Sequence, residues 1–478
     1  MKLKKSYLSV LISALLIGGG VTACSSGDNS SEPTGAVKTR SGVITGFGSV
    51  FVNGVEYETD NATITIDGQQ GSEDDLDIGM VVTLSGSVND DGASGMALSI
   101  DYDDEVEGSI SAINLSGGVS SIDVLGQTVN IDADTLFESD DAGITAIDML
   151  QVGNVVEISG YSSGAGEIFA TRIEVKSAAH TDGDEMEVKG LVTNLDTVAM
   201  TFSIGDLAID YSDAITEDFP ASGISDGQLV EAKTTSAIVD NTLFATKLEL
   251  ESEDGKSMDG DEGEEVEIEG VVTAELVDNR FMINDQVVII DNASTEFEHG
   301  SVDNIVSGVK LEVEGMLDAE GNLVASEIEF REQAETEIQG PIDAVSVENN
   351  SITVLGLEIQ ADTLTRMKDE RDDNEMTPVR YFSLADLSIG DWVDVEFYEN
   401  DSGERVATEM ERDDMPENGM VKLEGDISEV TETGLLIVSG ISIDVSISTD
   451  TFSVSDEIEV EGTFADGVLT ATAVSMDD

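Results

Sequence analysis

Carboxylates dominate the residues of this chain that could do chemistry. Asp and Glu number 101 in 478 residues, against 21 Lys and Arg, and the two histidines, His180 and His299, stand far apart. A zinc site or a Ser/His/Asp arrangement needs a histidine together with other ligands or a nucleophile at defined positions. Neither histidine belongs to such a set, and no Gly-rich phosphate loop leads into a helix pattern. The sequence therefore predicts a protein without catalysis.

One enzyme class remains compatible with so acidic a chain. Glycoside hydrolases use two carboxylates about 5–10 Å apart, one of which has a raised pKa. Because acidic residues occur throughout the sequence, no particular pair stands out. An acid-pair glycoside hydrolase is the third of three functional alternatives, and it predicts a cleft that holds two such carboxylates.

The net charge of −80 at pH 7 limits the classes of partner. Nucleic-acid binding depends on basic residues that displace counterions from phosphates, so nucleic acid is a poor partner for this chain. The same field attracts cations and basic proteins and repels anionic membrane surfaces. Adaptation to a salty medium, where charges are screened over about 8 Å or less, explains the acidity without any specific ligand.

Acidic runs concentrate between the repeated units described below, and they suggest calcium as a cofactor. Ca²⁺ takes six to eight oxygen ligands, which carboxylates at a junction could supply while stiffening the hinge. None of the runs matches the twelve-residue calcium loop, and a solvated charge run is the other interpretation. The candidate metal ligands are Asp101, Asp103, Asp104, Asp182, Asp184, Asp254, Asp259 and Asp261.

Positive charge concentrates in one place, the segment 366–382. The candidate partner-binding residues are Arg366, Lys368 and Arg371 in this segment and the only tryptophan, Trp392. Alternation in the strand that follows Gly390 places Trp392 on the outward face. The indole either forms a platform for a protein or glycan partner or is covered by segment 366–382, and we favour the cover.

The amino terminus carries the most specific signal. Three lysines precede an apolar stretch at residues 8–17. This stretch is too short to span a bilayer of about 30 Å and is typical of a secretory signal. Residues 21–24, Val-Thr-Ala-Cys, resemble the lipobox of bacterial lipoproteins. The resemblance implies removal of a signal peptide, residues 1–23, and attachment of lipid to Cys24.

Lipidation of Cys24 predicts membrane attachment in the bacterial envelope. More than one acyl chain makes such anchoring stable. Serines rather than an aspartate follow the cysteine, which favours the outer membrane in a Gram-negative source. Residues 24–39 are rich in Ser and Gly, a composition typical of a flexible tether. Cys24 is the only cysteine, so the chain forms no internal disulfide.

The elements that must position these candidates are repeated units of domain size. A glycine beside an opening strand recurs six times, and each time a phrase such as GVKLEVEG (308–315) and a hairpin follow. Apolar alternation with period two is typical of a strand buried on one face. A small residue recurs in the last strand of every unit and predicts close approach of another backbone. These residues are Ala97, Ala170, Ala245, Ala325, Ala407 and Ala471.

Each unit contains up to three strands, an irregular connector and a final hairpin. This order is typical of a five-stranded OB-type barrel, and a meander packed as a small β-sandwich is the alternative. We therefore predict an all-β chain of tandem, small OB-like barrels in an elongated array. Neighbouring units should stabilise one another through contacts, because a domain of this size is only marginally stable alone. The predicted units are residues 40–105, 106–178, 185–252, 265–332, 336–413, which has an insertion, and 417–478.

The first unit resembles a known repeat family. The phrases GVITGFGSVFVNG (42–54) and GMVV (79–82) are similar to the repeat called domain of unknown function 5666, found in bacterial lipoproteins and other exported proteins. The resemblance implies a fold and an exported setting but no activity. Together with the lipobox, it predicts a lipid-anchored, non-catalytic structural or binding module with an envelope or extracellular partner. A surface rod stiffened by calcium is the alternative.

Overall fold

The computed structural model describes residues 36–476, apart from 90–91, 116–119, 133, 142, 182, 254, 257, 259, 333, 370, 372–381 and 401. The signal segment and Cys24 lie outside the described residues, as do three candidate metal ligands, Asp182, Asp254 and Asp259. The part of the chain that is described forms strands and short 3₁₀ turns. It contains no helix with the length and apolar character needed to cross a membrane.

Unit 4 shows the plan of every barrel. Its first strand pairs antiparallel with the second and the fourth, the third pairs parallel with the fifth, and the fifth pairs antiparallel with the fourth. The sheet therefore closes on itself in the order 1-2-3-5-4-1. Its five strands are β22 (Glu265–Val277), β23 (Arg280–Ile283), β24 (Gln286–Ile290), β26 (Lys310–Leu317) and β27 (Leu323–Phe330).

The same closed circuit recurs in units 1, 2, 4, 5 and 6, which confirms the predicted barrels. In unit 3 the strands follow the same order, but the first and the fifth are each divided in two and the pairings lie in two sheets. Unit 1 contains β1 (Val37–Phe47), β2 (Val50–Val52), β3 (Val55–Glu58), β6 (Val81–Val88) and β7 (Ser94–Tyr102). Unit 2 contains β8 (Val106–Asn114), β9 (Ser120–Val124), β10 (Gln127–Ile131), β12 (Val155–Ser162) and β13 (Glu167–Ser177). Unit 3 contains β14 (Met186–Leu191) with β15 (Thr193–Asp196), β16 (Thr201–Ile204), β17 (Leu207–Asp210), β19 (Leu229–Thr234), and β20 (Thr242–Phe244) with β21 (Lys247–Ser252).

The last two units follow the same circuit. Unit 5 contains β28 (Thr336–Ser346), β29 (Ser351–Val354), β30 (Leu357–Gln360), β32 (Trp392–Glu399) and β33 (Arg405–Asp413). Unit 6 contains β34 (Val421–Val430), β35 (Leu436–Val438), β36 (Ile441–Asp444), β37 (Glu457–Ala465) and β38 (Val468–Met476). The first strand among the described residues begins at Val37, three residues before the expected start of unit 1 at Arg40.

The connector before the fourth strand adds a short strand parallel to the fifth in units 1 to 5. These strands are β4 (Thr63–Ile66), β11 (Leu136–Ser139), β18 (Ile215–Glu217), β25 (Glu296–Glu298) and β31 (Arg366–Asp369), and β4 also pairs with β5 (Gln69–Gln70). Short 3₁₀ turns complete the secondary structure. They are η1 (Glu73–Asp75), η2 (Ile147–Met149), η3 (Val302–Asn304), η4 (Val347–Asn349) and η5 (Leu384–Asp386).

The recurring alanine lies where two backbones nearly touch. In unit 4, Gly315 of β26 pairs with Ala325 of β27 next to an irregularity in the register. A Cβ atom at Gly315 would lie 2.2 Å from the carbonyl oxygen of Val324, closer than any real side chain allows. The side chain of Ala325 is 2% exposed, so a larger residue has no room there. The glycine and the alanine of the repeated phrase are therefore explained by a bend in the closing hairpin.

The glycine of the opening strand makes room for a turn. A Cβ atom at Gly270 would lie 2.2 Å from Asn284 Oδ1. Asn284 occupies the turn between β23 and β24 with a φ of 54°, a left-handed conformation that asparagine tolerates. Its Oδ1 accepts a hydrogen bond of 3.0 Å from the backbone N–H of Val271. This turn therefore packs directly onto the opening strand and helps to close the barrel.

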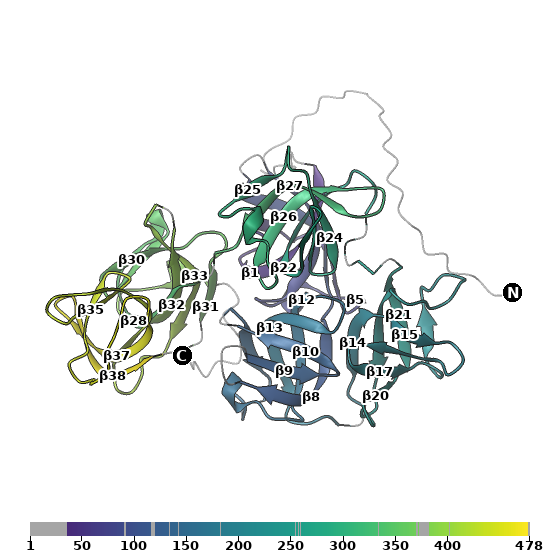
Figure 1. Cartoon of the computed structure of the whole chain (residues 1–478), viewed down its shortest axis with the longest axis horizontal. Coiled ribbons are helices and arrows are strands. Elements are labelled where there is room, and N and C mark those ends of the chain that lie inside the picture. Colours follow the sequence, from purple (N-terminus) through teal and green to yellow (C-terminus); the bar gives the residue numbers. More distant parts are fainter. Residues whose placement is uncertain are drawn as a thin grey trace, which may run out of the picture.

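The barrels associate in three pairs through their first strands (Figure 1). Strand β8 pairs antiparallel with β14, and β28 pairs antiparallel with β34, so units 2 and 3 and units 5 and 6 are joined. Strand β1 pairs parallel with β22, which joins unit 1 to unit 4. We expected the units to follow one another in a row, and this third pairing corrects that expectation. The chain folds back, because the open edge of β1 accepts a strand from more than 200 residues away.

Candidate functional sites at the junctions between barrels

A buried ion pair lies at the junction of units 1 and 4. Arg40 Nε of β1 donates to Glu267 Oε2 of β22 at 2.9 Å, and Asn53 Nδ2 donates to the other carboxylate oxygen at 2.9 Å. Arg40 is 4% exposed, and its guanidinium carbon lies 5.8 Å from the centroid of the Tyr57 ring. Charge-assisted bonds of this kind are about twice as strong as neutral ones. This pair therefore holds together two units that are far apart in the sequence.

A second buried cation, Arg172 of β13, lies where unit 2 meets unit 1. Its guanidinium group bonds Glu174 at 2.7 Å and Glu138 at 2.6 Å, both in unit 2, and lies 3.6 Å from Asp77 of unit 1. Arg172 is 2% exposed. Its neighbour Thr171 donates a hydrogen bond of 2.6 Å to the carbonyl oxygen of Gly79 in unit 1. Two adjacent residues of β13 therefore make contacts both within unit 2 and with unit 1.

One loop of unit 2 receives cations from units 4 and 5. Lys310 of unit 4 contacts Asp132 at 3.1 Å and also bonds Asp134. Arg366 of unit 5 donates to the backbone oxygen of Asp134 at 2.9 Å. Burial opposes ionisation of Asp134, but the charges of Lys310 and Arg366 hold its pKa below the ordinary value. Three units therefore meet at this loop.

The basic residues predicted to bind a partner are engaged within the chain. Arg366 docks unit 5 onto unit 2, as described above. Lys368 Nζ lies 3.9 Å from Glu411, and Arg371 Nε donates to Asp369 at 2.8 Å. The local concentration of positive charge therefore serves contacts inside the chain.

Trp392 is buried, as expected if segment 366–382 covers the indole. Its side chain is 7% exposed and belongs to the apolar core shared by units 5 and 6, together with Phe382 and Leu387. Both Trp392 and Val393 are buried because the strand begins at Trp392, where simple alternation ends. Phe382 is the last residue of segment 366–382, so that segment contributes to the cover. An exposed platform at Trp392 is excluded.

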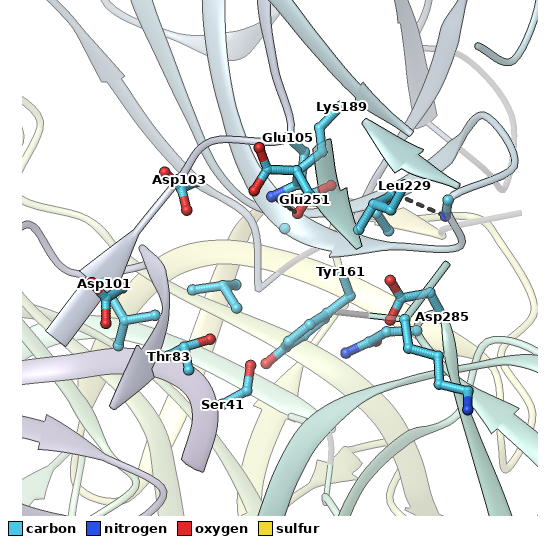
Figure 2. A pocket seen from close by; sticks show the side chains of 17 residues that line it. Ser41, Thr83, Asp101, Asp103, Glu105, Tyr161, Lys189, Leu229, Glu251 and Asp285 are labelled. Carbon is cyan, nitrogen blue, oxygen red and sulfur yellow. Dashed lines mark hydrogen bonds and ion pairs between the residues drawn. The ribbon is translucent and has the colours of Figure 1, made fainter. Parts of the chain in front are cut away.

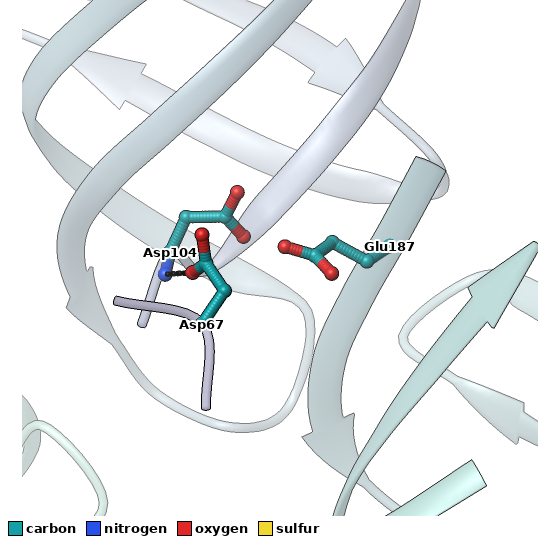
Figure 3. A group of neighbouring side chains, drawn as sticks. All are labelled: Asp67, Asp104 and Glu187. Atoms are coloured by element: carbon teal, nitrogen blue, oxygen red, sulfur yellow. Dashed lines mark hydrogen bonds between the residues drawn. The ribbon is translucent and has the colours of Figure 1, made fainter. Parts of the chain in front are cut away.

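Three carboxylates converge where units 1, 2 and 3 meet (Figure 3). Asp67 follows β4, Asp104 lies between β7 and β8, and Glu187 belongs to β14. One oxygen from each lies within 4.8 Å of the others. Asp104 and Glu187 are 2% and 3% exposed, and the backbone N–H of Asp104 donates to Asp67 Oδ1 at 3.4 Å. Of the predicted metal ligands, Asp104 therefore lies in a buried acidic cluster.

Two more carboxylates adjoin Asp104. Oxygens of Asp104, Glu107 and Glu157 also lie within 4.8 Å of one another. Glu157 accepts a hydrogen bond of 3.0 Å from the hydroxyl of Tyr102. Burial raises the pKa of Asp104 well above its ordinary value, and the charge of Glu187 adds to the effect. Burial likewise raises the pKa of Glu107 to about 7. Burial and mutual repulsion therefore favour the protonated forms of these carboxylates as long as no cation lies among them.

A cavity of about 150 Å³ opens where units 1 to 4 meet (Figure 2). It has room for a few water molecules and is smaller than the 300–1,000 Å³ or so typical of ligand pockets. Lys189 and Glu105 form an ion pair of 2.9 Å in its wall. Two predicted metal ligands, Asp101 and Asp103, also line it, apart from the cluster around Asp104.

The remaining two predicted ligands that the structure describes lie in exposed turns. Asp184 accepts a hydrogen bond of 3.1 Å from the backbone N–H of Thr181. The backbone N–H of Asp261 donates to Glu264 Oε2 at 3.2 Å. Within the described part of the chain, neither belongs to a cluster of three potential ligands. These two residues therefore stabilise local turns.

A larger cavity, of about 750 Å³, lies between units 2 and 5. Four carboxylates on neighbouring strands line it, and the strand register places Asp394 opposite Glu411 and Glu396 opposite Glu409. Like charges directly opposite one another destabilise a sheet. Burial raises the pKa of Asp394, Glu396 and Glu411 to about 8. Outward-facing residues of β32 and β33 thus form an acidic wall, which consists of Asp394, Glu396, Glu409 and Glu411.

This acidic wall predicts an unusual pH dependence. Because the pKa of Glu396 is raised in the folded state, its contribution to stability is complete below about pH 4 and is lost as the pH rises through about 8. We expect Glu396→Gln to stabilise the chain by about 1–3 kcal/mol at pH 9, after allowance for solvent screening, and to have little effect at pH 5. Calorimetric melts at both pH values measure this difference.

The exposed Glu348 of the same unit provides the control. Glu348→Gln should leave the melting temperature within experimental error at both pH values, since isolated surface charges contribute little. Equal effects of Glu396→Gln at pH 5 and pH 9 would show that the carboxylate is already ionised in the folded chain.

Five segments of the chain match the family described as Domain of unknown function (DUF5666), namely residues 35–101, 107–174, 269–329, 339–411 and 424–475. They correspond to units 1, 2, 4, 5 and 6. Unit 3 lies outside these matches although its strands pair in the same order. A search of curated proteins found no match.

Proposed function

The chain belongs to the DUF5666 family, and from that premise we propose that it is a lipid-anchored, non-catalytic structural or binding module of the bacterial envelope. The family description assigns no activity. The proposal therefore depends on how this chain joins its barrels and on the lipobox that precedes them.

The pairing of β1 with β22 carries the proposal. It joins residues 39–41 to residues 266–268 in parallel register and encloses the buried Arg40–Glu267 pair. Units that are only tethered move independently, whereas units joined through a common sheet hold their outer surfaces in fixed relative positions. Fixed positions of repeated surfaces suit a scaffold or a multivalent binding module.

The lipobox supplies the attachment in this proposal. Between Cys24 and the first strand at Val37, the chain reaches at most about 45 Å when fully extended. Unit 1, and unit 4 with it, would then remain close to the membrane. Units 5 and 6 would extend the acidic surface toward a cationic or basic partner, in keeping with the net charge.

Membrane fractionation of cells that produce Cys24→Ser tests the anchor. We expect the wild-type chain in the outer-membrane fraction and the variant in the soluble fraction, because a signal peptide alone leaves no lipid on the mature chain. Protease treatment of intact cells then distinguishes surface display from periplasmic retention. Membrane association that is unchanged in Cys24→Ser would contradict the proposal, provided that both chains are recovered in similar amounts.

The cavity between units 2 and 5 supports a second candidate function, an acid-pair glycoside hydrolase. Its volume lies within the range of ligand pockets, and the raised pKa of Glu396 suits a general acid. Turnover of envelope polysaccharides by the wild-type chain, abolished in both Glu396→Gln and Glu411→Gln, would favour this candidate over the non-catalytic module. Without such turnover, the acidic wall has a structural or binding role only.

A further inference from the structure

We propose that a calcium ion binds among Asp67, Asp104 and Glu187 and locks units 1, 2 and 3 together. The three residues come from three different units or linkers and are brought together only by folding (Figure 3). The inference goes beyond the proposed function, since it does not depend on the lipid anchor or on an external partner.

The spacing of the oxygens matches one shared ion. Calcium binds oxygen at about 2.3–2.6 Å, so two ligands on opposite sides of the ion are about 4.6–5.2 Å apart. The ligand oxygens of Asp67, Asp104 and Glu187 all lie within 4.8 Å of one another. Magnesium binds at about 2.0–2.1 Å, demands near-ideal octahedral geometry and gives up its water reluctantly, so a group of protein carboxylates suits calcium better. All the donors are carboxylate oxygens, which disfavours zinc.

An independent observation at Asp104 points to a missing ligand. The residue is 2% exposed, and its Oδ1 atom is buried without a hydrogen-bond partner among the residues described. In Figure 3 this carboxylate extends into the space shared with Glu187. Buried polar atoms are almost always satisfied in folded proteins, and an unpaired buried carboxylate is especially costly. A cation at this position would supply the missing partner.

The lysines near the cluster bond Glu187 and Glu157 at its edge, and neither forms an ion pair with Asp104 among the residues described. Lys233 bonds Glu187 and lies 3.0 Å from Glu231, while Lys176 lies 2.9 Å from Glu157 and also contacts Glu174. In the described part of the chain, no ion pair reaches Asp104. These lysines neutralise the outer edge of the cluster and leave its centre negative.

Further oxygens are available to complete the coordination. Glu107 and Glu157 form a second group around Asp104 within the same 4.8 Å limit. Calcium takes six to eight oxygen ligands, and carboxylates bind it through one or both oxygens, with water in the remaining positions. Asp104 belongs to the short linker between β7 and β8, so the ion would fix the angle between barrels 1 and 2.

Calorimetric titration of the full chain with CaCl₂, after removal of bound metal by a chelator and at constant ionic strength, tests the proposal. We expect a saturable site that is absent in Asp104→Asn. At a calcium concentration one hundred times Kd, the melting temperature of the transition that includes units 1 to 3 should rise by about 5 °C. MgCl₂ at equal ionic strength should give a smaller rise.

Two variants separate ligand loss from misfolding. Asp104→Asn removes a buried charge, so without calcium it should melt at or above the wild-type temperature. Asp184→Asn changes an exposed candidate ligand in a turn outside the cluster and should keep the calcium response. Equal calcium responses in wild type and Asp104→Asn would overturn the proposal. So would a rise in melting temperature that KCl at the same ionic strength reproduces.

Discussion

Replacing Arg172 by methionine is expected to lower the free energy of unfolding of the transition that includes unit 2 by about 3–5 kcal/mol. Arg172 is 2% exposed and neutralises two carboxylates of its own unit, Glu138 and Glu174, while approaching Asp77 of unit 1. Methionine fills similar volume but removes this cation from both carboxylates, of which Glu174 keeps Lys176 at 3.1 Å. The loss should therefore come from uncompensated charge more than from lost packing.

Differential scanning calorimetry can measure this effect, with each transition assigned to its units by limited proteolysis. A chain of several barrels need not unfold in one step, so the enthalpy of each transition must be fitted separately. The control is Arg280→Met, at an exposed position of β23. A surface change of this kind should stay within about 0.5 kcal/mol. A loss below about 1 kcal/mol for Arg172→Met would mean that water reaches the carboxylates after the substitution.

Much of the fold could be predicted from the sequence because the barrel is encoded locally. Alternating apolar residues identify the strands, and the recurring glycine and alanine mark the bend in each closing hairpin, as at Gly315 and Ala325. These signals act within one unit of 60–80 residues or so, the range over which strand order and turn chemistry are linked. That order is typical of a five-stranded barrel but also compatible with a small β-sandwich, and the strand pairings decide for the closed barrel.

The association of barrels could not be predicted in the same way. Whether β1 pairs with β22 depends on two edges separated by more than 200 residues, and neither edge carries a local signal. The same limit applies to the carboxylate cluster. Asp104 stood in an acidic junction and was a candidate, but Asp67 and Glu187 join it only through the packing of three units. Strand alternation could have identified Glu187 as outward-facing, whereas Asp67 lies in a turn without a distinctive pattern.

Burial of Trp392 shows a related limit. Alternation places every second residue on one face, but it does not indicate which outward residues a connector or a neighbouring unit covers. In this chain the outer faces of several strands are interfaces. Rows of glutamate on those faces therefore meet other barrels rather than solvent alone, and scarce cations such as Arg172 and Lys310 lie where the barrels touch.

A double-mutant cycle at Arg40 and Glu267 should give the second large effect. Arg40→Met is expected to lower the free energy of unfolding by about 3–5 kcal/mol. Glu267 is 7% exposed, and of the bonds described above it would keep only the one donated by the neutral side chain of Asn53. Glu267→Met alone should cost a similar amount. The double variant should recover at least about 2 kcal/mol of the summed losses, since paired apolar residues need no counter-charge.

Salt dependence distinguishes this buried pair from the exposed contacts beside it. Lys38 also bridges units 1 and 4, with Glu265 at 2.5 Å and Glu314 at 2.8 Å, but its side chain is 23% exposed. Salt should weaken the Lys38 contacts and leave the Arg40–Glu267 coupling largely unchanged, because buried pairs are screened much less. A coupling energy that disappears at high salt would mean that water enters the junction. The β1–β22 backbone pairing would then be the main connection between the two units.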